Sequence, residues 1–458
     1  MVLVRICDRY LRQTYTIIPV FSVSLPLTSP QMTMYRRFLS ALIAISLGGP
    51  ALAQGTVSTQ GIITDPDGAA WKVTQEVQTK MRRTTSQGVP GASLDYTSDI
   101  MSSDWAIPLV RSYMARYPDP RKAYWAEYSY VHGYVMDAIL RLYLSSGDKV
   151  YLDYVKTYID HFVDSDGTYH GARLNSLDNI MTGSVISRLY GITREGKYAS
   201  AARHIMEAVD SYPASDGQFW HSTRYADMWI DGVFMGQMFL LRYAQYIGDK
   251  DKRLDIACRN VIVAANHLQR ADGLMYHAWS ARDPYPSWAD PKTGLASQVW
   301  SEGLGWYALI IVELLEALPS NHPQRAQVEE IYHKLAGGLL ATQDERTGGW
   351  FMVVDRGEFP LNFIDPSGTA MFLYSIRKGL DLGLLPRKRF QDSPIKAFDC
   401  LRSFVQVNGN GLLDILGGCD GVGVQDGFLD YLVIPKMTNA KETVGGAIWA
   451  ALLMEGKI

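Results

Sequence analysis

The sequence predicts an all-α protein, an (α/α)6 barrel of six inner and six outer helices. Apolar residues recur at i, i+3, i+4 and i+7, as in "YVMDAILRLYL" (134–144) and "ALIIVELLEAL" (308–318), and this spacing is typical of helices. Helices that are apolar nearly all round also alternate with amphipathic ones. The former must be buried and the latter lie outside, so the alternation predicts two concentric layers. A helical bundle or a solenoid is the competing architecture.

Twelve helices are expected in all. The segments 228–247 and 301–317 are rich in glycine and aromatic residues and are expected in the inner layer, whereas 251–268 and 321–342 are charged on one face and are expected outside. In chain order the expected helices are 71–84, 126–145, 150–163, 178–192, 197–211, 228–247, 251–268, 301–317, 321–342, 366–382, 387–406 and 440–455.

The links between these helices differ in length and composition. The links 212–227, 269–300 and 343–365 are long and rich in aromatic residues, whereas 146–149 and 248–250 are short. In a two-layer barrel the long links all emerge at one end. Long loops that gather at one end of a rigid scaffold commonly form a binding site, so we expect a cleft there.

Composition narrows the class of ligand. The chain has 458 residues, 47 % hydrophobic and 20 % charged, with a net charge of −3. This balance allows a large core and gives no reason to expect nucleic acid or an anionic membrane surface as a partner. The 11 Trp and 27 Tyr favour a flat ligand such as a sugar, although any single aromatic residue is more often part of the core.

The N-terminal region predicts export. Residues 34–53 begin with Met34, continue with two arginines and a short apolar run, and end in "ALA", which is typical of a cleaved secretory signal. A membrane anchor is the weaker alternative, because the apolar run is too short to span a bilayer. Residues 1–33 are then an upstream extension, and 54–458 form a single catalytic domain. The mature protein is expected in the periplasm or outside the cell, without a membrane partner.

No cofactor or metal is expected. The chain lacks a P-loop, a GxGxxG motif, a GxSxG motif and an HExxH motif. The spacing of its four cysteines, Cys7, Cys258, Cys400 and Cys419, fits no metal site. Cys400 and Cys419 could pair in an oxidising compartment, and the sequence leaves that question open. It also leaves the oligomeric state open.

Asp231 is the first candidate catalytic residue. It is the only charged residue between Met228 and Leu241, near the start of an apolar helix. Such a carboxylate could cap the helix or pair with an arginine. Alternatively, desolvation among apolar neighbours raises its pKa, so that it holds a proton near neutral pH and acts as a general acid. Trp229 and His221 are close enough in the chain to line the same pocket.

Asp178 is the second candidate. It stands at the start of another inner helix, where an aspartate is often an N-cap. If it lies at the same barrel end as Asp231, two carboxyl groups face one cleft, which is the usual equipment for attack on a glycosidic bond. The loops add His277, Trp300, Glu302 and Trp306, although a lone loop histidine is more often a surface residue.

Several segments in this order resemble the unsaturated uronyl hydrolases of glycoside hydrolase family 105 and the related family 88. They are "FWHSTRYADMWIDGVFMG", "MYHAW", "WADPKTGLASQVWSEGLGWYAL" and "DPSGTAMFLYSIRKGL". The resemblance covers most of 120–455 and implies an (α/α)6 barrel. It also implies an enzyme that removes a 4,5-unsaturated uronic acid from the non-reducing end of lyase-generated oligosaccharides.

The resemblance assigns roles to particular residues. Asp231 is implied as the acid/base that protonates C4 and then activates the water that adds at C5, and Asp178 as the second family aspartate. The resulting hemiketal collapses and breaks the glycosidic link. The positions implied to contact the saccharide are His221, Trp229, His277, Trp300, Trp306 and, as a weaker match, Tyr130.

Glu302 departs from the pattern of the rhamnogalacturonyl members, which carry an arginine at this place. A glutamate cannot imitate a bidentate guanidinium, and it repels the substrate's carboxylate unless it is protonated or paired. Either Arg224 or Arg282 then supplies the cation, or the substrate differs.

Two other functions are possible on the sequence alone. One is an inverting glycosidase acting on a saturated uronic-acid-containing or neutral oligosaccharide, with Glu302 and Asp231 as its two acids. The other is a carbohydrate-binding protein without catalysis. In every case the partner is an oligosaccharide.

Overall fold

A computed structural model describes residues 62–64, 70–72, 84–86, 104–124, 127–359, 361–419 and 421–458. The expected upstream extension and signal segment lie outside these residues. In the part that the model describes, no helix is both long and apolar enough to cross a membrane.

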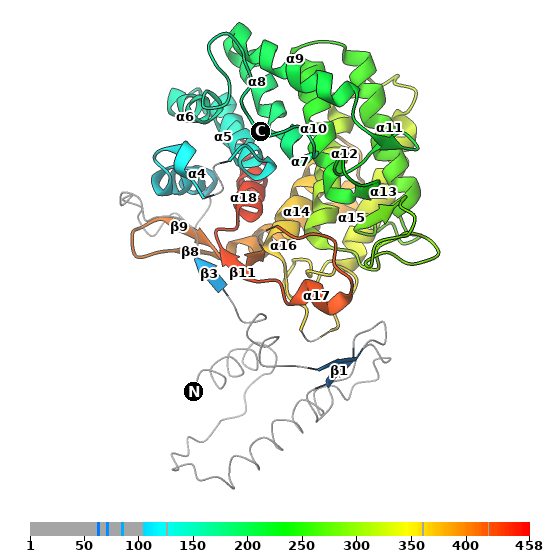
Figure 1. The fold of residues 1–458 in the computed structure, drawn as a ribbon. Coiled ribbons are helices and arrows are strands. Elements are labelled where there is room, and N and C mark those ends of the chain that lie inside the picture. The colour runs from blue at the N-terminus through cyan, green and yellow to red at the C-terminus, as the bar shows by residue number, and fades with distance from the viewer. Residues whose placement is uncertain are drawn as a thin grey trace. The chain divides into compact units, whose positions relative to one another are not determined.

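Six helices form a closed inner ring, in which each packs on the next and the last returns to the first (Figure 1). They are apolar nearly all round, and α12 is buried from Ser301 to Leu315. A fully buried leucine or phenylalanine contributes about 1.5–3 kcal/mol relative to an exposed one, so the ring is the principal core. The ring consists of α5 (Tyr130–Ser146), α8 (Gly183–Thr193) with the short α7 (Asp178–Met181) before it, α10 (Ile230–Tyr246), α12 (Ser301–Ala317), α14 (Pro366–Asp381) and α18 (Lys441–Met454).

Six further helices lie outside this ring, each against one inner helix. They are amphipathic: α9, for example, buries Tyr198, Ile205 and Val209 and exposes its charged face. The outer helices are α6 (Lys149–Ile159), α9 (Gly196–Asp210), α11 (Lys250–Leu268), α13 (Arg325–Thr342), α16 (Asp392–Arg402) after the short α15 (Arg387–Phe390), and α4 (Ala106–Arg116). The (α/α)6 barrel expected from the alternation is therefore confirmed.

One of the twelve expected helices, 71–84, is described only at its two ends, and its interior lies outside the described residues. Both ends are strand, in β2 (Ala70–Lys72) and β3 (Thr84–Ser86), so the expected bounds are wrong. Strand β3 pairs in parallel with β11 (Lys436–Thr438), so backbone pairing over a long sequence distance overrides the local pattern. The outer position is taken by α4, whose proline at 108 lies in the first turn, where a helix tolerates it.

The remaining small elements lie in the loops between the barrel helices. The expected helix 387–406 ends early, because its last residues enter β8. The other elements are β1 (Ile62–Thr64), β4 (Ala214–Ser215), β5 (Gln218–Phe219), β6 (Asp227–Trp229), β7 (Ala278–Ser280), β8 (Val405–Val407), β9 (Leu413–Ile415), β10 (Gly418–Cys419), the 3-10 turn η2 (Pro120–Lys122) and α17 (Phe428–Leu432). Cys400 and Cys419, whose pairing was open, are both free buried thiols.

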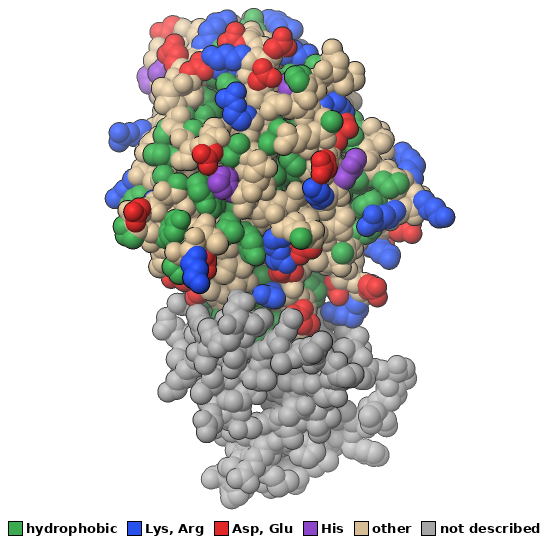
Figure 2. Space-filling model, turned by 90° about the vertical axis from the view of Figure 1, so that its right-hand side faces the viewer, with side chains coloured by type: hydrophobic (Ala, Val, Ile, Leu, Met, Phe, Trp, Pro, Cys, Tyr) green, Lys and Arg blue, Asp and Glu red, His purple; other side chains and the backbone are tan. Residues whose placement is uncertain are grey.

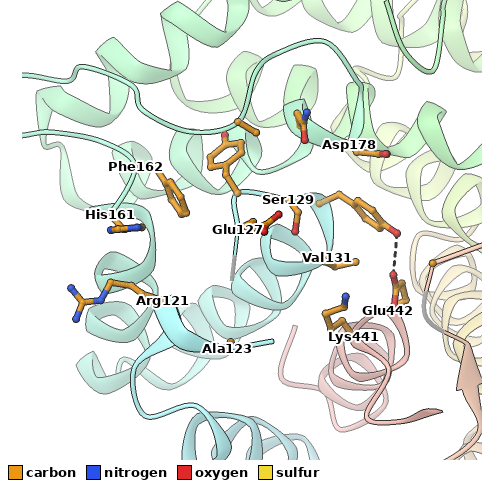
Figure 3. Close-up of a pocket in the computed structure, with 15 residues that line it drawn as sticks. Arg121, Ala123, Glu127, Ser129, Val131, His161, Phe162, Asp178, Lys441 and Glu442 are labelled. Carbon is orange, nitrogen blue, oxygen red and sulfur yellow. Dashed lines mark hydrogen bonds between the residues drawn. The ribbon is translucent and has the colours of Figure 1, made fainter. Parts of the chain in front are cut away.

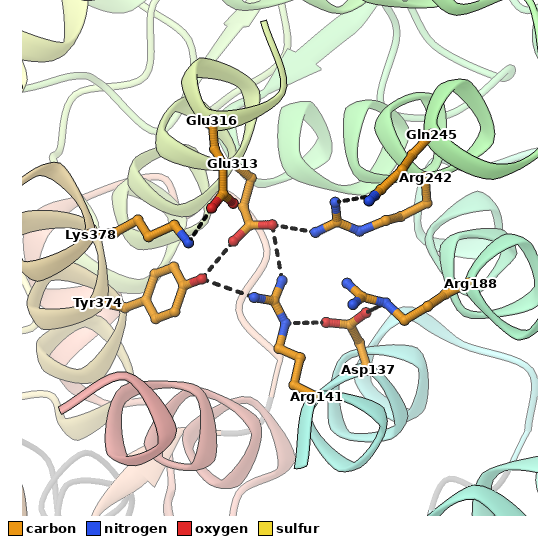
Figure 4. A network of polar contacts seen from close by, with 9 residues as sticks. All are labelled: Asp137, Arg141, Arg188, Arg242, Gln245, Glu313, Glu316, Tyr374 and Lys378. Carbon is orange, nitrogen blue, oxygen red and sulfur yellow. Dashed lines mark hydrogen bonds and ion pairs between the residues drawn. The ribbon is translucent and has the colours of Figure 1, made fainter. Parts of the chain in front are cut away.

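The inner helices run in the same direction, because residues near their starts meet at one end and residues near their ends meet at the other. At the far end a buried polar network joins five of them (Figure 4): Asp137 and Arg141 of α5, Arg188 of α8, Arg242 of α10, Glu313 of α12 and Tyr374 of α14. The near end carries the long loops. On the face shown in Figure 2, acidic and basic side chains are interspersed, in keeping with the small net charge.

Candidate active site

Four inner-layer helices carry an acidic residue in their first turn: Asp178, Asp231, Glu302 and Glu442. Neither Asp178 nor Asp231 caps its helix, because another residue holds the cap position in each case and no side chain makes a cap bond. The capping interpretation of both aspartates is therefore wrong. The positive ends of the helix dipoles converge on this end of the barrel and favour negative charge there.

Backbone hydrogen bonds between the long loops bring the candidate residues together. Strand β6 pairs antiparallel with β7, and the amide of Ile230 donates to the carbonyl of His277 at 2.9 Å. The amide of Leu177 donates to the carbonyl of His221, also at 2.9 Å. These bonds place the loop histidines beside the starts of α10 and α7, which is why the side chains meet.

Two histidines flank Asp231. Its Oδ2 lies 3.8 Å from Nδ1 of His221, and its Oδ1 lies 3.8 Å from Nε2 of His277. His221 also approaches Asp178, with 3.4 Å between Nε2 and Oδ2. The expected meeting of both aspartates, His221 and His277 is thus present in the structure. The charged partner of Asp231 is an imidazole, and the arginine pairing considered from the sequence is wrong.

The charges follow from these contacts. Burial lowers the pKa of His221, but Asp178 and Asp231 more than offset burial and raise it to about 9. Burial raises the pKa of Asp231, yet His221 and His277 outweigh burial, and the net pKa lies below the usual 3.8. The expectation that apolar neighbours keep Asp231 protonated is therefore wrong for the free protein: a carboxylate faces an imidazolium at neutral pH.

His277 is held in one orientation from its far side. Its Nδ1 lies 2.7 Å from the hydroxyl of Tyr431, which accepts a hydrogen bond from the amide of Gln425. Burial lowers the pKa of His277, so the ring is neutral. With the Tyr431 hydroxyl donating to Nδ1, the Nε2–H of His277 faces Asp231. Tyr431 lies in α17, and nothing in the local sequence pattern distinguishes it.

Aromatic rings surround the histidines. Trp229 stacks on His221 with 4.3 Å between ring centroids and an interplanar angle of 16°. Trp300 packs against His277 at 4.6 Å. Trp306 is buried inside the barrel, 6.0 Å from the ring of Tyr130. Trp229 and Trp300 therefore flank the acid group, whereas Trp306 supports its surroundings from below.

Tyr130 lines the cavity on the side of the site that faces Glu442. Its hydroxyl donates to Glu442 at 3.0 Å, a bond that Figure 3 marks. Glu442 was not anticipated from the sequence, although the same signal that pointed to Asp231, one acid in the first turn of an apolar helix, is present there. Glu302 lies in the corresponding turn of α12 and is 1 % exposed.

The two arginines considered as substitutes for the family arginine are placed differently. Arg282 is engaged by Asp227, with 2.7 Å between Nη2 and Oδ2, and Arg224 is exposed beside the ring of Tyr225. The imidazolium of His221 is the positive charge that lies next to Asp178 and Asp231 in the described part of the chain.

Several buried polar atoms of the site lack a hydrogen-bond partner among the described residues. Buried polar groups are normally hydrogen-bonded, so these atoms are available to a bound ligand. The buried atoms without a hydrogen-bond partner include Trp229 Nε1, Trp300 Nε1, Asp231 Oδ1, His221 Nδ1 and His277 Nε2.

A cavity of about 1080 Å³ opens beside Asp178 and extends past Glu442 toward Arg121, His161 and Phe162 (Figure 3). It is larger than the pockets of about 300–1,000 Å³ that hold most small ligands. Asp231 is not a wall of this cavity; it approaches Nδ1 of His221, whereas Asp178, which does line the cavity, approaches Nε2.

Asp178, His221 and Asp231 could also hold a metal ion, because one ligand atom of each lies within 4.8 Å of the others. A histidine must be neutral to bind a metal, and the raised pKa of His221 opposes this. We expect EDTA to leave turnover unchanged and micromolar Zn²⁺ to inhibit it by occupying Asp231. Activation by added Zn²⁺ or loss of activity in EDTA would contradict this expectation.

Gly232 allows His221 to approach α10. A Cβ on Gly232 would lie 2.7 Å from His221 Nδ1 and 3.2 Å from the side chain of Leu177. Gly232→Ala is therefore expected to push the imidazole out of place and to lower kcat by about 10- to 100-fold. Gly337→Ala in α13, where a Cβ meets only the end of the Arg389 side chain at 3.9 Å, is the matched control and should retain full activity. Equal activity of the two variants would refute the packing argument.

A two-layer helical barrel with acids, histidines and tryptophans at one end defines a carbohydrate-processing hydrolase. The profile of Glycosyl Hydrolase Family 88 matches residues 106–456, and the chain belongs to this family. The protein is thus a glycoside hydrolase, as the resemblance of its sequence segments implied.

Known relatives agree with this assignment. The glycoside hydrolase from family 105 of C. acetobutylicum ATCC 824 is 27 % identical, with a TM-score of 0.73 over 77 % of this chain and 100 % of that one. The unsaturated glucuronyl hydrolase of Bacillus sp. GL1 shares the fold, with a TM-score of 0.56 at 16 % identity over 76 % of this chain and 94 % of that one. An unsaturated 3S-rhamnoglycuronyl hydrolase of Alteromonas sp. (strain LOR) is 27 % identical over 40 % of this chain and 42 % of its own length.

Proposed function

We propose that this enzyme removes a 4,5-unsaturated uronic acid from the non-reducing end of lyase-generated oligosaccharides, by hydration of the double bond. The observation that carries the proposal is the single carboxylate of Asp231 held between His221 and His277, with Asp178 beside it. One acid that gives and then takes a proton is sufficient for hydration. The names of the family 88 and family 105 relatives support the same substrate class.

The protonation states of His221 and Asp231 fit this chemistry. A bound uronate brings a second negative charge toward Asp231 and raises its pKa, so that Asp231 takes a proton from the His221 imidazolium 3.8 Å away. Asp231 delivers this proton to C4. Its carboxylate then removes a proton from the water whose oxygen bonds to C5. The hemiketal so formed opens and releases the saccharide, which leaves as an alcohol, and an unsaturated bond is lost for each bond cleaved.

The cavity beside Asp178 provides room for the rest of the oligosaccharide. We place the uronate at Asp178 and Asp231 and the saccharide that it leaves in the cavity toward His161 and Phe162. Phe162 and Tyr128 form an aromatic pair in its wall, 5.2 Å apart, which suits the apolar face of a sugar ring.

The test is a screen for loss of ultraviolet absorbance on lyase-treated pectin, rhamnogalacturonan, ulvan and glycosaminoglycan digests. Hydration consumes the absorbance of the double bond, and hydrolysis of a saturated sugar does not. Loss of absorbance together with release of a keto acid is expected on at least one digest. Release of a saturated sugar without absorbance loss would favour the inverting glycosidase, and tight binding without any product would favour a binding protein.

The pH dependence follows from His221. Because its pKa of about 9 lies above the ordinary 6.5, the ion pairs of His221 stabilise the folded protein fully below about pH 6.5, and this stability is lost as the pH rises through about 9. We expect kcat/KM to fall over the same alkaline limb, because the imidazolium supplies the proton. A rate that stays level to pH 10 would exclude His221 as the proton source.

We also propose that the protein is exported after cleavage of the signal at 34–53. Fractionation of cells that produce the full chain should recover the enzyme outside the cytoplasm, with Gln54 as its first residue. Recovery of a cytoplasmic protein with an intact N-terminus would refute export and leave the enzymatic proposal untouched.

A further inference from the structure

Three carboxyl groups meet under the cleft, each about 1 % exposed. Two of them accept hydrogen bonds. Asp365 caps α14 by accepting from the amides of Ser367 and Gly368, and Glu442 accepts from Tyr130. Glu302 is different, because neither of its oxygens has a hydrogen bond of normal geometry in the part of the chain that the structure describes.

Among the described residues, none of the groups that bear most on Glu302 carries a positive charge, and the nearby Lys436 acts on Asp365 and Cys419. The groups that bear most on it are Glu442 from α18, Asp365 from the start of α14, and Ser367 and Trp306; on further elements, Tyr130 and Cys419 both respond to its charge. Burial raises the pKa of Glu302 well above 4.5, and Glu442 and Asp365 raise it further, while Ser367 and Trp306 offset this in part. Glu302 therefore holds its proton more firmly than an ordinary glutamic acid does.

A neutral carboxyl group donates one hydrogen bond, whereas a carboxylate only accepts. In α12, Glu302 follows Trp300, which flanks His277. It also acts on Tyr130, whose partner Glu442 lines the cavity together with Asp178. The unpaired carboxyl group thus lies behind Glu442 and Tyr130, two residues that line the cavity that we assign to the saccharide.

We propose that Glu302 is the neutral hydrogen-bond donor to an uncharged oxygen of the saccharide, while Glu442 accepts the hydrogen bond of Tyr130 and holds it in place. The proposal rests on the proposed function for the identity of the ligand. A carboxylate or sulfate at this point would meet the acidic groups of Glu442 and Asp365, which bear directly on Glu302. The floor of the cleft therefore selects a hydroxyl or ring oxygen, where an arginine at the same position would select an anion.

Three variants separate charge from hydrogen bonding. Glu302→Gln keeps a neutral donor of the same shape and should keep KM within about threefold of the wild type. Glu302→Ala removes the donor and should raise KM by roughly three- to tenfold with little change in kcat, the size expected of one neutral hydrogen bond. Glu330→Gln on the exposed face of α13 is the control and should change neither constant. If Glu302→Gln is as impaired as Glu302→Ala, or if Glu302→Ala binds normally, the proposal is wrong.

A measurement without substrate tests the protonation of Glu302 separately. Since its pKa is raised in the folded state, its contribution to stability is present below about pH 4.5 and is lost as the pH rises toward the folded value. The glutamine does not titrate, so the Tm of Glu302→Gln should rise relative to the Tm of the wild type as the pH rises from about 5 to 9. Parallel Tm curves would overturn the neutral carboxyl group.

The two proposals fail in different ways. A wild-type enzyme that consumes no unsaturated digest refutes the proposed function, while the Tm measurement still reports on Glu302. An active wild type with parallel Tm curves refutes only the role of Glu302.

Discussion

Replacing Asp231 with asparagine is expected to lower kcat by about 10²- to 10⁴-fold while KM stays within about threefold of the wild-type value. The amide has the shape of the carboxyl group, so it can keep the contacts of Asp231 to His221 and His277. It cannot deliver a proton to C4 or accept one from water, and general acid–base catalysis contributes a factor of this size.

The assay is absorbance loss on the best digest from the screen, with binding of the same oligosaccharide measured by calorimetry. Asp251→Asn is the matched control, because Asp251 occupies the same first-turn position in the outer helix α11 and is exposed. The control should turn over normally. Turnover of Asp231→Asn within tenfold of the wild type would show that another group moves the proton.

The charge state of the variant provides a second readout. With the Asp231 charge gone, His221 loses one of the carboxylates that raise its pKa, while Asp178 and Asp227 remain, so the pKa of His221 should fall from about 9 toward its ordinary 6.5. NMR titration of the imidazole would detect this shift. A His221 pKa that does not move would mean that Asp231 is not one of the charges that set it.

Much of the barrel could be predicted from the sequence because periodicity reports burial directly. The segment 301–317 is apolar on every face, and α12 has these bounds. The pattern did not predict the strand β3 at the end of the segment 71–84, whose partner β11 lies more than 300 residues away. A local window contains no information about such a partner, and tertiary pairing overrides propensity.

The residues of the site were more predictable than their charges. A lone aspartate in an apolar helix indicated Asp231, but its apolar neighbours in sequence suggested a raised pKa. The neighbours that decide the pKa, His221 and His277, are brought to it by loop backbone bonds. Glu442 carried the same first-turn signal and was missed, whereas Tyr431 carries no local signal at all.

The second large effect is expected on stability, from a substitution in the buried polar network at the opposite end of the barrel. Glu313→Gln is expected to reduce the free energy of unfolding by about 3–5 kcal/mol, because it breaks a buried ion network and leaves charges unpaired. Glu313 accepts from Arg141 at 3.0 Å and from Tyr374 at 2.6 Å, and it also pairs with Arg242. Urea unfolding at pH 7 measures the loss.

The charge balance explains the size of this effect. Three arginines, Arg141, Arg188 and Arg242, share two acids, Asp137 and Glu313, and all five side chains are buried. Removing one acid leaves three guanidinium groups to one carboxylate. Glu330→Gln, whose salt bridge with Lys334 is exposed, is the control and should cost at most about 1 kcal/mol.

A double variant tests whether charge balance or lost packing is responsible. Arg242→Met combined with Glu313→Gln removes one charge of each sign, so it should be less destabilised than Glu313→Gln alone. If the two losses simply add, unpaired charge is not the cause.

Low pH should weaken the same network by protonating Glu313. Burial raises the pKa of Glu313, but Arg141 and Arg242 outweigh burial and hold it well below 4.5. Its stabilising contribution is therefore present above about pH 4.5 and is lost as the pH falls toward the folded pKa. The wild type should lose stability below pH 4.5 more steeply than Glu313→Gln, because glutamine has no proton to gain. The free energies of unfolding of the two proteins should therefore converge in acid. Such convergence identifies Glu313 as the charge that holds the inner helices together at this end of the barrel.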